Sequence, residues 1–128
     1  MNNTVVIDMN FVFDNNIPIY IQLVEQLKIY IISGNIKSGD RLPSVRELAL
    51  QTKVNPNTMQ KALVELEELG LIYTERTNGK FVTDNKKLID ELREKYAGEL
   101  TLNYISNMKK IGLDNDEIFK YLESIGGE

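Results

Sequence analysis

Asn55-Pro56-Asn57-Thr58-Met59-Gln60-Lys61-Ala62-Leu63-Val64-Glu65-Leu66-Glu67-Glu68-Leu69-Gly70 is the stretch that decides the fold of this chain. It predicts one helix, because Asn55 is a good N-cap, Pro56 suits the first helical position and Gly70 suits the C-terminal end. One face is apolar and has helical spacing, with Met59, Ala62, Leu63, Leu66 and Leu69. We therefore expect this face to pack against the rest of a small domain.

The opposite face of this helix is polar, and its charge changes along its length. The first turns carry Asn57, Gln60 and Lys61, whose side chains can bond base edges or phosphates. The last turns carry three glutamates, which would repel phosphates if the helix lay flat along DNA. Insertion by the N-terminal end avoids this repulsion and directs the positive end of the helix dipole at the nucleic acid. The alternative is an ordinary amphipathic helix with a solvated polar face.

A second short helix precedes this stretch. Ser44 and Glu47 have the spacing of a capping box, directly after a proline. Arg46 falls in the first turn, where a cation opposes the helix dipole but gains if it meets a phosphate or a guanine edge. The alternative for Arg46 is a pair with Glu47 or a solvated side chain. The tight connection at 51–54 makes the two helices a helix-turn-helix.

A β-hairpin is predicted after Gly70. Residues 71–75 and 80–83 have strand composition, and Asn78-Gly79 between them is a strong hairpin signal. A basic hairpin that follows a helix-turn-helix is a wing. Its tip, from Arg76 through Thr77, Asn78 and Gly79 to Lys80, could lie along a DNA backbone or enter a minor groove. The alternative is a hairpin with a structural role alone.

The segments before the helix-turn-helix have weaker signals. Residues 4–14 are rich in β-branched and aromatic side chains and predict a short strand or an extended arm. A helix is predicted from about Pro18 to Ser33, with one apolar stripe formed by Tyr20, Leu23, Val24, Leu27, Tyr30 and Ile31. A second, broken strip contains Ile21, Ile29 and Ile32. It could pack on the N-terminal arm, on the tail or on another subunit.

The tail from residue 85 onward predicts two amphipathic helices. In the first, apolar side chains recur every four residues at Leu88, Leu92, Tyr96, Leu100, Tyr104 and Met108, and Gly98 could mark a bend. Asp114 and Glu117 form a capping pair for the second. Two such helices have little core of their own, so we expect them to pack against a second copy of the chain. The alternative is packing onto the helix at 18–33 of the same subunit.

Composition excludes several kinds of site. The 128 residues include no cysteine and no histidine, which excludes a disulfide framework, a zinc site and a histidine-based triad. We expect no cofactor and no enzymatic activity, because no nucleophile has a recognisable base beside it. No apolar run reaches the roughly 18 residues of a membrane span, and the N-terminus lacks signal-peptide features, so a cytoplasmic location is expected.

The charge is unevenly distributed. The net charge of −4 by itself argues against nucleic-acid binding. From Lys37 to Lys61, however, five basic and two acidic side chains give +3, and the segment from Arg76 to Lys80 adds +2. A local basic surface on an acidic protein is compatible with DNA binding.

The segment from Ile17 to Thr83 resembles the GntR family of bacterial transcription regulators. The resemblance rests on Pro18-Ile19-Tyr20-x-Gln22-Leu23, Gly34, Gly39-Asp40-Arg41-Leu42-Pro43-Ser44-Val45-Arg46-Glu47-Leu48-Ala49, Val54-Asn55-Pro56-Asn57-Thr58-x-Gln60-Lys61-Ala62, Leu66, Gly70-Leu71-Ile72 and Gly79-x-Phe81-Val82. The Asn-Pro-Asn-Thr start of the helix and the short two-helix tail look like the YtrA-type branch.

The resemblance implies roles for individual residues. In relatives, DNA is contacted from the positions of Arg46, Asn55, Asn57, Thr58, Gln60 and Gly79. Pro56 and Gln60 stand where the fatty-acid-responsive branch places arginines, so different bases should be read, since Gln pairs with adenine and Arg with guanine. YtrA-like relatives often repress operons for membrane transport, commonly ABC transporters, and for envelope stress.

We therefore expect an α+β, mostly helical chain with an N-terminal strand or arm (1–16), a winged helix-turn-helix DNA-binding domain (17–84) and a helical dimerisation tail (85–128). The expected function is a homodimeric repressor on a palindromic operator. The candidate DNA-binding residues are Ser44, Arg46, Asn55, Asn57, Thr58, Gln60, Lys61, Arg76, Thr77, Asn78, Gly79 and Lys80. The alternative function is a protein-interaction module without an operator. A small-molecule effector could bind between two tails, although no cluster there identifies one.

Overall fold

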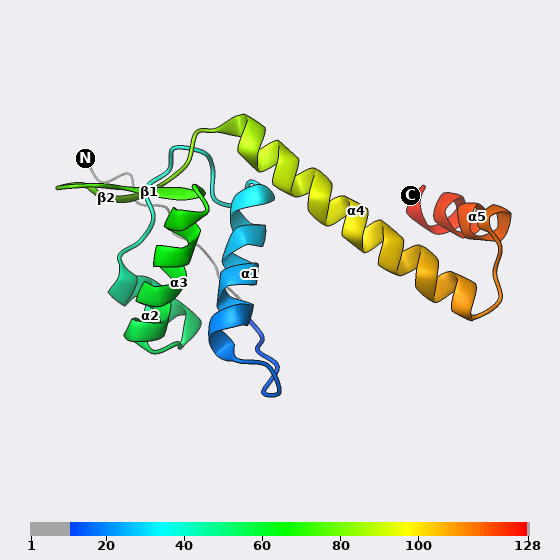
Figure 1. Ribbon diagram of the computed structural model, residues 1–128, viewed down its shortest axis with the longest axis horizontal. Helices are drawn as coiled ribbons and strands as arrows, with labels where there is room; N and C mark the ends of the chain where they lie inside the picture. The colour runs from blue at the N-terminus through cyan, green and yellow to red at the C-terminus, as the bar shows by residue number, and fades with distance from the viewer. Residues whose placement is uncertain (1–10, 128) are drawn as a thin grey trace. The chain divides into compact units, whose positions relative to one another are not determined.

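The computed structural model describes residues 11–127, which form five helices and one two-stranded hairpin (Figure 1). The elements are α1 (Ile19–Ile32), α2 (Val45–Thr52), α3 (Pro56–Glu68), β1 (Ile72–Glu75), β2 (Gly79–Val82), α4 (Lys86–Lys110) and α5 (Asn115–Gly126). This order confirms the predicted fold class, a winged helix-turn-helix followed by C-terminal helices.

The chain divides into two compact units, one that extends to Glu91 and one that begins at Leu92. The division falls inside α4, so the first turns of this helix belong to the winged-helix unit. Ile89 is buried there, and the Leu88 Cδ2 atom lies 3.5 Å from the position that a Cβ on Gly70 would take. The first turns of α4 therefore pack with the winged-helix unit.

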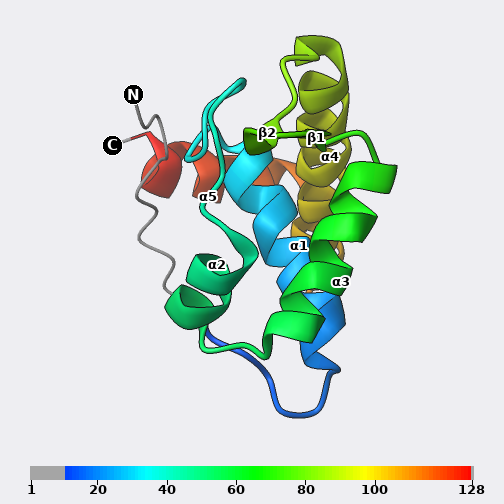
Figure 2. The same ribbon diagram turned by 90° about the vertical axis from the view of Figure 1, so that its left-hand side faces the viewer.

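Helix α3 is the centre of the winged-helix unit and contacts α1, α2 and β1 (Figure 2). Its start has the predicted form, because the Asn55 side chain accepts a hydrogen bond from the Asn57 backbone N–H at 2.8 Å and Pro56 is the first helical residue. Four members of the predicted apolar stripe are buried: Met59, Ala62, Leu63 and Leu66.

The predicted stripe is wrong at its last member. Leu69 is 45% exposed, because α3 ends at Glu68 and Leu69 is its C-cap. Gly70 then adopts a left-handed conformation with φ +81°, which a residue without a side chain adopts at little cost. The turn sends Leu71 into the core, where it is fully buried.

Helix α1 contributes one side of the core. Its buried residues are Leu23, Val24, Leu27, Ile31 and Ile32. The second predicted strip is divided, because Ile21 and Ile29 are each about half-exposed whereas Ile32 is buried. The strip is therefore not a continuous apolar surface.

The described part of the N-terminal segment lies against α1. The Gln22 side-chain oxygen accepts from the Asp14 N–H, and its side-chain nitrogen donates to the Asp14 carbonyl, both at 2.7 Å. The Phe11 and Tyr30 rings have centroids 5.3 Å apart. Residues 11–16 form no strand. The rest of the predicted strand or arm, residues 1–10, lies outside the described residues.

The helix-turn-helix forms as predicted, with two local details of its own. The Ser44 hydroxyl accepts from the Glu47 N–H and donates to the Glu47 carboxylate, both at 3.1 Å. The predicted capping box is therefore only partly formed, since Glu47 bonds the hydroxyl of Ser44 and not its backbone N–H. Lys53 ends α2 in a left-handed conformation with φ 58°, at the turn into α3.

The wing is an antiparallel hairpin in which Ile72 pairs with Val82 and Glu75 pairs with Gly79. A third stretch of backbone joins its free edge. The Leu42 N–H donates to the Lys80 carbonyl at 2.8 Å, and the Val82 N–H donates to the Asp40 carbonyl at 2.9 Å. The link between α1 and α2 therefore extends the sheet of the wing.

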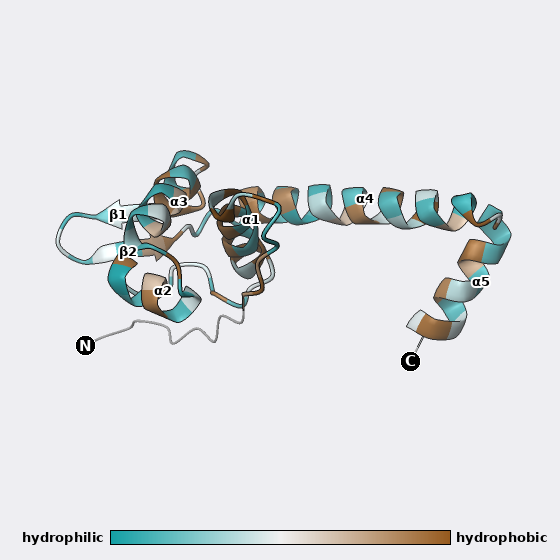
Figure 3. Cartoon of the chain, turned by 90° about the horizontal axis from the view of Figure 1, so that it is seen from below, coloured by the Kyte–Doolittle hydropathy of each residue, from teal (hydrophilic) through white to brown (hydrophobic). Residues whose placement is uncertain are grey.

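The second unit consists of most of α4 together with α5. Helix α4 continues through Gly98, and the predicted capping box between Asp114 and Glu117 is complete at the start of α5. Figure 3 shows hydrophobic residues along α5, yet of the described apolar side chains from Leu92 onward only Ile118 is buried. No helix in the described part of the chain is long and apolar enough to cross a membrane.

Candidate nucleic-acid interface

The first turns of α3 present a polar surface. Asn57, Gln60 and Lys61 are exposed, and Thr58 is half-buried. Asn55 has a structural role, since its side-chain oxygen caps the helix. The buried stripe on the opposite side fixes the helix in the domain, so these polar groups project from a rigid support.

Lys61 is held at the side of α1. Its Nζ lies 4.5 Å from the centroid of the Tyr20 ring, which is a cation–π contact. The Tyr20 hydroxyl is hydrogen-bonded to the Glu65 carboxylate, one turn further along α3. Partial burial, this hydrogen bond and the nearby negative charges of Glu65 and Glu68 raise the pKa of the Tyr20 phenol. Tyr20 therefore contacts both a cation and an anion of the same helix.

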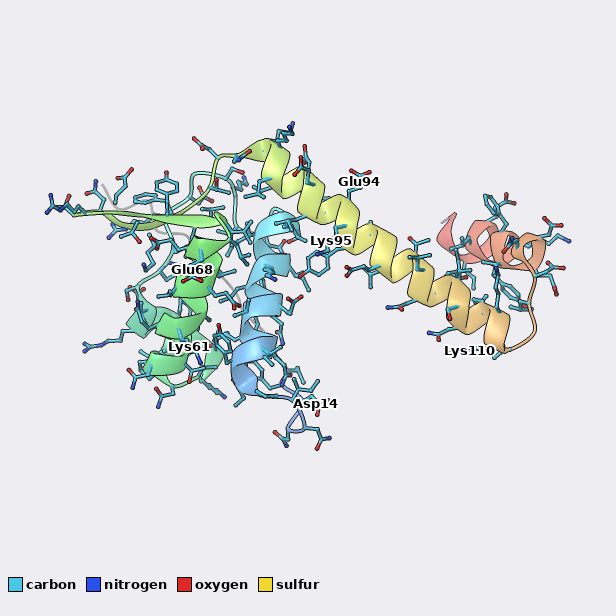
Figure 4. All side chains as sticks on the ribbon, in the orientation of Figure 1. Asp14, Lys61, Glu68, Glu94, Lys95 and Lys110 are labelled. Atoms are coloured by element: carbon cyan, nitrogen blue, oxygen red, sulfur yellow. The ribbon has the colours of Figure 1, made fainter. Side chains whose placement is uncertain are left out.

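The acidic side chains of α3 lie in its second half, as the sequence indicates. Figure 4 shows Lys61 near the start of the helix and Glu68 near its end. Glu67 accepts hydrogen bonds from Thr74 Oγ1 at 2.7 Å and from Lys80 Nζ at 3.3 Å. The bond from Thr74, with the bond and charge of Lys80, lowers the pKa of Glu67. The glutamates are thus separated from the polar start of the helix, and Glu67 is engaged with the wing.

The predicted contacts on α2 are both accessible. Ser44 and Arg46 are exposed. The alternative of an Arg46–Glu47 pair is not seen among residues 11–127, because the Glu47 carboxylate accepts from the Ser44 hydroxyl and forms no ion pair with Arg46. Arg46 is therefore available for an anion from outside the chain.

Some of the predicted residues of the wing are exposed to solvent, and others are hydrogen-bonded within the domain. Arg76, Thr77 and Asn78 are exposed, and Asn78 Nδ2 donates to Glu75 at 3.1 Å. Lys80 pairs with Thr74, one pair in from the turn, and its Nζ donates to Thr74 Oγ1 at 2.9 Å as well as to Glu67. Its charge is thus partly neutralised within the domain.

Arg41 is a basic residue near the site that is absent from the predicted set. It forms an antiparallel bridge with Phe81 of β2. It also lines a groove of about 410 Å³ between the start of α2 and the wing, together with Ser44, Arg76 and Gly79. Its basic charge was a signal in the sequence, but its pairing with the wing depends on residues forty positions apart in the chain.

Comparisons with known proteins bear on this geometry. The family model described as "Bacterial regulatory proteins, gntR family" matches residues 19–82, which is half of the chain. The chain belongs to the GntR family. A GntR relative, the HTH-type transcriptional repressor YtrA of Bacillus subtilis (strain 168), is 35% identical over 112 residues, which cover 87% of this chain and 86% of YtrA. The resemblance to small GntR regulators of the YtrA type is thereby confirmed.

Solved structures of GntR proteins share the fold. A GntR family transcriptional regulator from Listeria monocytogenes matches with a TM-score of 0.79 and 42% identity, over 88% of this chain and 99% of that one. The DNA-binding domain of AraR in complex with operator ORX1 matches with a TM-score of 0.50 and 26% identity, over 64% of this chain and 96% of that one. The chain is therefore a DNA-binding GntR transcriptional regulator and not an enzyme, and its helix-turn-helix binds operator DNA.

Proposed function

We propose that this protein is a homodimeric, sequence-specific repressor that binds a palindromic operator through α3 and the wing. The observation that carries the proposal is the exposed, polar start of α3 on a helix whose opposite face is buried. A helix held in this way enters a major groove by its N-terminal end, where its dipole is positive and its side chains reach base edges.

The side chains divide between two kinds of contact. Asn57, Thr58 and Gln60 lie near base edges, and the Gln60 amide suits the N6 and N7 atoms of adenine. Ser44, Arg46 and Lys61 contact phosphates or an adjacent base, and these contacts set the position of the helix in the groove. The wing, residues 76–80, lies along the backbone or in the minor groove.

The tail supports a dimer. Phe119, Leu122 and Ile125 of α5 are exposed by 65%, 50% and 71% in the single chain, and Leu100 of α4 by 67%. This much exposed apolar surface on two helices favours their packing against the same surface of a second copy. A two-fold dimer places the two copies of α3 roughly 34–36 Å apart or a multiple of this, on the two half-sites of a palindrome.

Kinship supports the direction of regulation and the kind of target. YtrA is named as a transcriptional repressor, and we propose that this protein also represses transcription. An operon for membrane transport or envelope stress is the expected target, and the protein acts on chromosomal DNA in the cytoplasm.

Fluorescence anisotropy tests the proposal. The intact protein is titrated into a labelled duplex from the region upstream of its own gene, at several salt concentrations, with a scrambled duplex as competitor. A genome-wide selection of bound fragments supplies a second duplex. We expect tight, salt-dependent binding of at least one natural duplex that survives the competitor, with two subunits per site.

The same titration separates the proposal from the alternative function. A protein-interaction module would bind the natural, selected and scrambled duplexes with equal and weak affinity. Such a result, with no fragment enriched by the selection, would contradict the repressor proposal.

A further inference from the structure

Arg41 belongs to the sheet of the wing, although it lies in the link between α1 and α2. The hydrogen bonds of Asp40 and Leu42 with β2 hold its backbone on either side, and Arg41 itself pairs with Phe81. Paired residues of neighbouring strands project their side chains from the same face. The link and the wing are therefore one structural unit, in which Arg41 has a defined position.

The face that carries Arg41 is the outer face of this sheet. Leu42 and Val82, which alternate with Arg41 and Phe81 along their strands, are buried in the core. On the outer face, Phe81 stacks with Tyr73 at a centroid separation of 5.6 Å. Arg41 pairs with Phe81 on this face and is half-buried, so part of its side chain reaches solvent.

Gly79 makes room for the guanidinium group of Arg41. A Cβ atom on Gly79 would lie 3.3 Å from Nε and 3.5 Å from Nη2 of Arg41. The guanidinium group therefore lies directly over the wing glycine. Gly79 also has φ +100°, a conformation that other residues rarely adopt. The backbone conformation favours glycine, and a Cβ at this position would make the Arg41 guanidinium shift by a few tenths of an ångström.

The groove that Arg41 lines has cations without acidic partners. Neither Arg41 nor Arg76 forms an ion pair within residues 11–127. The two carboxylates that line the same groove accept hydrogen bonds from neighbours in the chain, Glu47 from the Ser44 hydroxyl and Glu75 from Asn78 Nδ2. Guanidinium N–H groups at this place are therefore available to an oxygen anion from outside the chain.

We propose that Arg41 donates hydrogen bonds to a backbone phosphate of the operator from the groove between α2 and the wing. This inference rests on the proposed function. The groove joins the start of α2 to the tip of the wing, both of which are predicted to meet the DNA backbone, and Arg41 lies between them. Its planar group matches the geometry of a phosphate, and its support on Gly79 limits the freedom lost on binding.

The test compares Arg41→Gln with the intact protein by anisotropy over a range of salt concentrations, on a duplex obtained by selection and on its scrambled version. Glutamine retains a planar group and most of the stem but removes the charge. We expect roughly tenfold weaker binding to both duplexes and an unchanged ratio between them. The slope of log K against log salt should fall by about 0.9, the value for one phosphate.

Two further variants control for charge and folding. Lys95→Gln makes the same change of charge on α4, outside the winged-helix unit, and should leave the slope unchanged. Arg41→Lys keeps the charge but loses the planar fork, so it should retain the slope while binding more weakly. If Arg41→Gln lowers the melting temperature, the salt slope of Arg41→Lys tells whether Arg41 acts on DNA or on the fold. A salt slope of Arg41→Lys that is reduced as much as that of Arg41→Gln would indicate a structural role and overturn the proposal.

The outcomes separate this inference from the proposed function. Suppose that the intact protein and Arg41→Gln both bind the selected duplex tightly and have the same slope of log K against log salt. Arg41 then does not contact a phosphate, and the repressor proposal still holds. If Arg41→Gln changes the ratio between the duplexes, Arg41 contacts a base and the phosphate assignment is wrong. If the intact protein selects no sequence, both proposals fail together.

Discussion

Gln60 and Lys61 are neighbours on α3, but different chemistry is expected of them. Both are exposed near the start of the helix. An amide can recognise one base through two hydrogen bonds, whereas an ammonium group attracts every phosphate alike. The two residues therefore allow affinity and specificity to be separated experimentally at one place on the helix.

We predict that Gln60→Ala reduces discrimination at one base pair of each half-site by roughly 1–3 kcal/mol. Lys61→Ala should instead weaken binding to all duplexes alike and reduce the salt slope by about 1. The measurement is anisotropy on a selected duplex and on a set of single-base-pair variants of it. A uniform loss of affinity in both mutants would show that Gln60 does not read a base.

Glu67 connects α3 to the wing through Thr74 and Lys80, and its pKa lies below the usual value of 4.5. A lowered pKa in the folded state means that the ionised carboxylate stabilises the fold. This contribution is complete above pH 4.5 and is lost as the pH falls through the lower pKa of the folded protein. Because Glu67 is largely exposed, we expect its ionised carboxylate to contribute less than about 1 kcal/mol to the free energy of unfolding.

We predict that Glu67→Gln is less stable than the intact protein at pH 7 and that the difference disappears in acid. Urea unfolding at pH 7 and at pH 3 measures the two free energies. Glu68→Gln is the matched control, since this exposed neighbour forms no hydrogen bond with the wing among the contacts described above. A difference that persists in acid would point to a cause other than the charge of Glu67.

At the scale of elements, the turn between α2 and α3 determines the direction in which α3 leaves α2. Lys53 adopts φ 58° at this turn, although it has a side chain. Its backbone N–H donates to the Ala49 carbonyl and closes α2. This left-handed conformation costs roughly 1–2 kcal/mol in an ordinary residue and much less in glycine.

We predict that Lys53→Gly stabilises the protein by about 0.5–1 kcal/mol, after allowance for the greater freedom of glycine in the unfolded chain. Lys53→Ala removes the same charge but keeps a Cβ atom, so it should give no such gain. Thermal unfolding followed by circular dichroism compares the three proteins. Equal stabilisation by glycine and alanine would show that charge, not backbone conformation, is responsible.

At the scale of the whole molecule, the second unit leaves large apolar side chains of α4 and α5 exposed. Ile125 is 71% exposed, and its neighbour Ser124 lies on the polar side of α5. Burying an isoleucine is worth roughly 1.5–3 kcal/mol, and a two-fold interface buries it twice. One apolar position on α5 should therefore contribute substantially to dimer formation.

We predict that Ile125→Asp raises the dimer dissociation constant at least about 100-fold, whereas Ser124→Asp leaves it nearly unchanged. Analytical ultracentrifugation of the two variants and the intact protein measures this. Since Ile125 is largely exposed in the single chain, its replacement should not disturb the winged-helix unit. An Ile125→Asp protein that dimerises normally would place the interface elsewhere.

The local features of the fold could be predicted from the sequence because each depends on neighbouring residues. The Asn55 cap, Pro56 and Gly70 define α3 within one stretch, and Asn78-Gly79 marks the wing. The exposed start of α3 likewise follows from helical spacing once the apolar stripe is known. These signals were sufficient for the fold class and for the family.

Only the tertiary structure placed residues that lie far apart in the chain. It put the guanidinium group of Arg41 over Gly79, paired Lys80 with Glu67, and buried Leu71 while Leu69 stayed exposed. Each of these depends on the exact end of a helix or on the pairing of distant backbone segments. Periodicity and composition describe one segment at a time, so contacts between segments emerge only when the chain has folded.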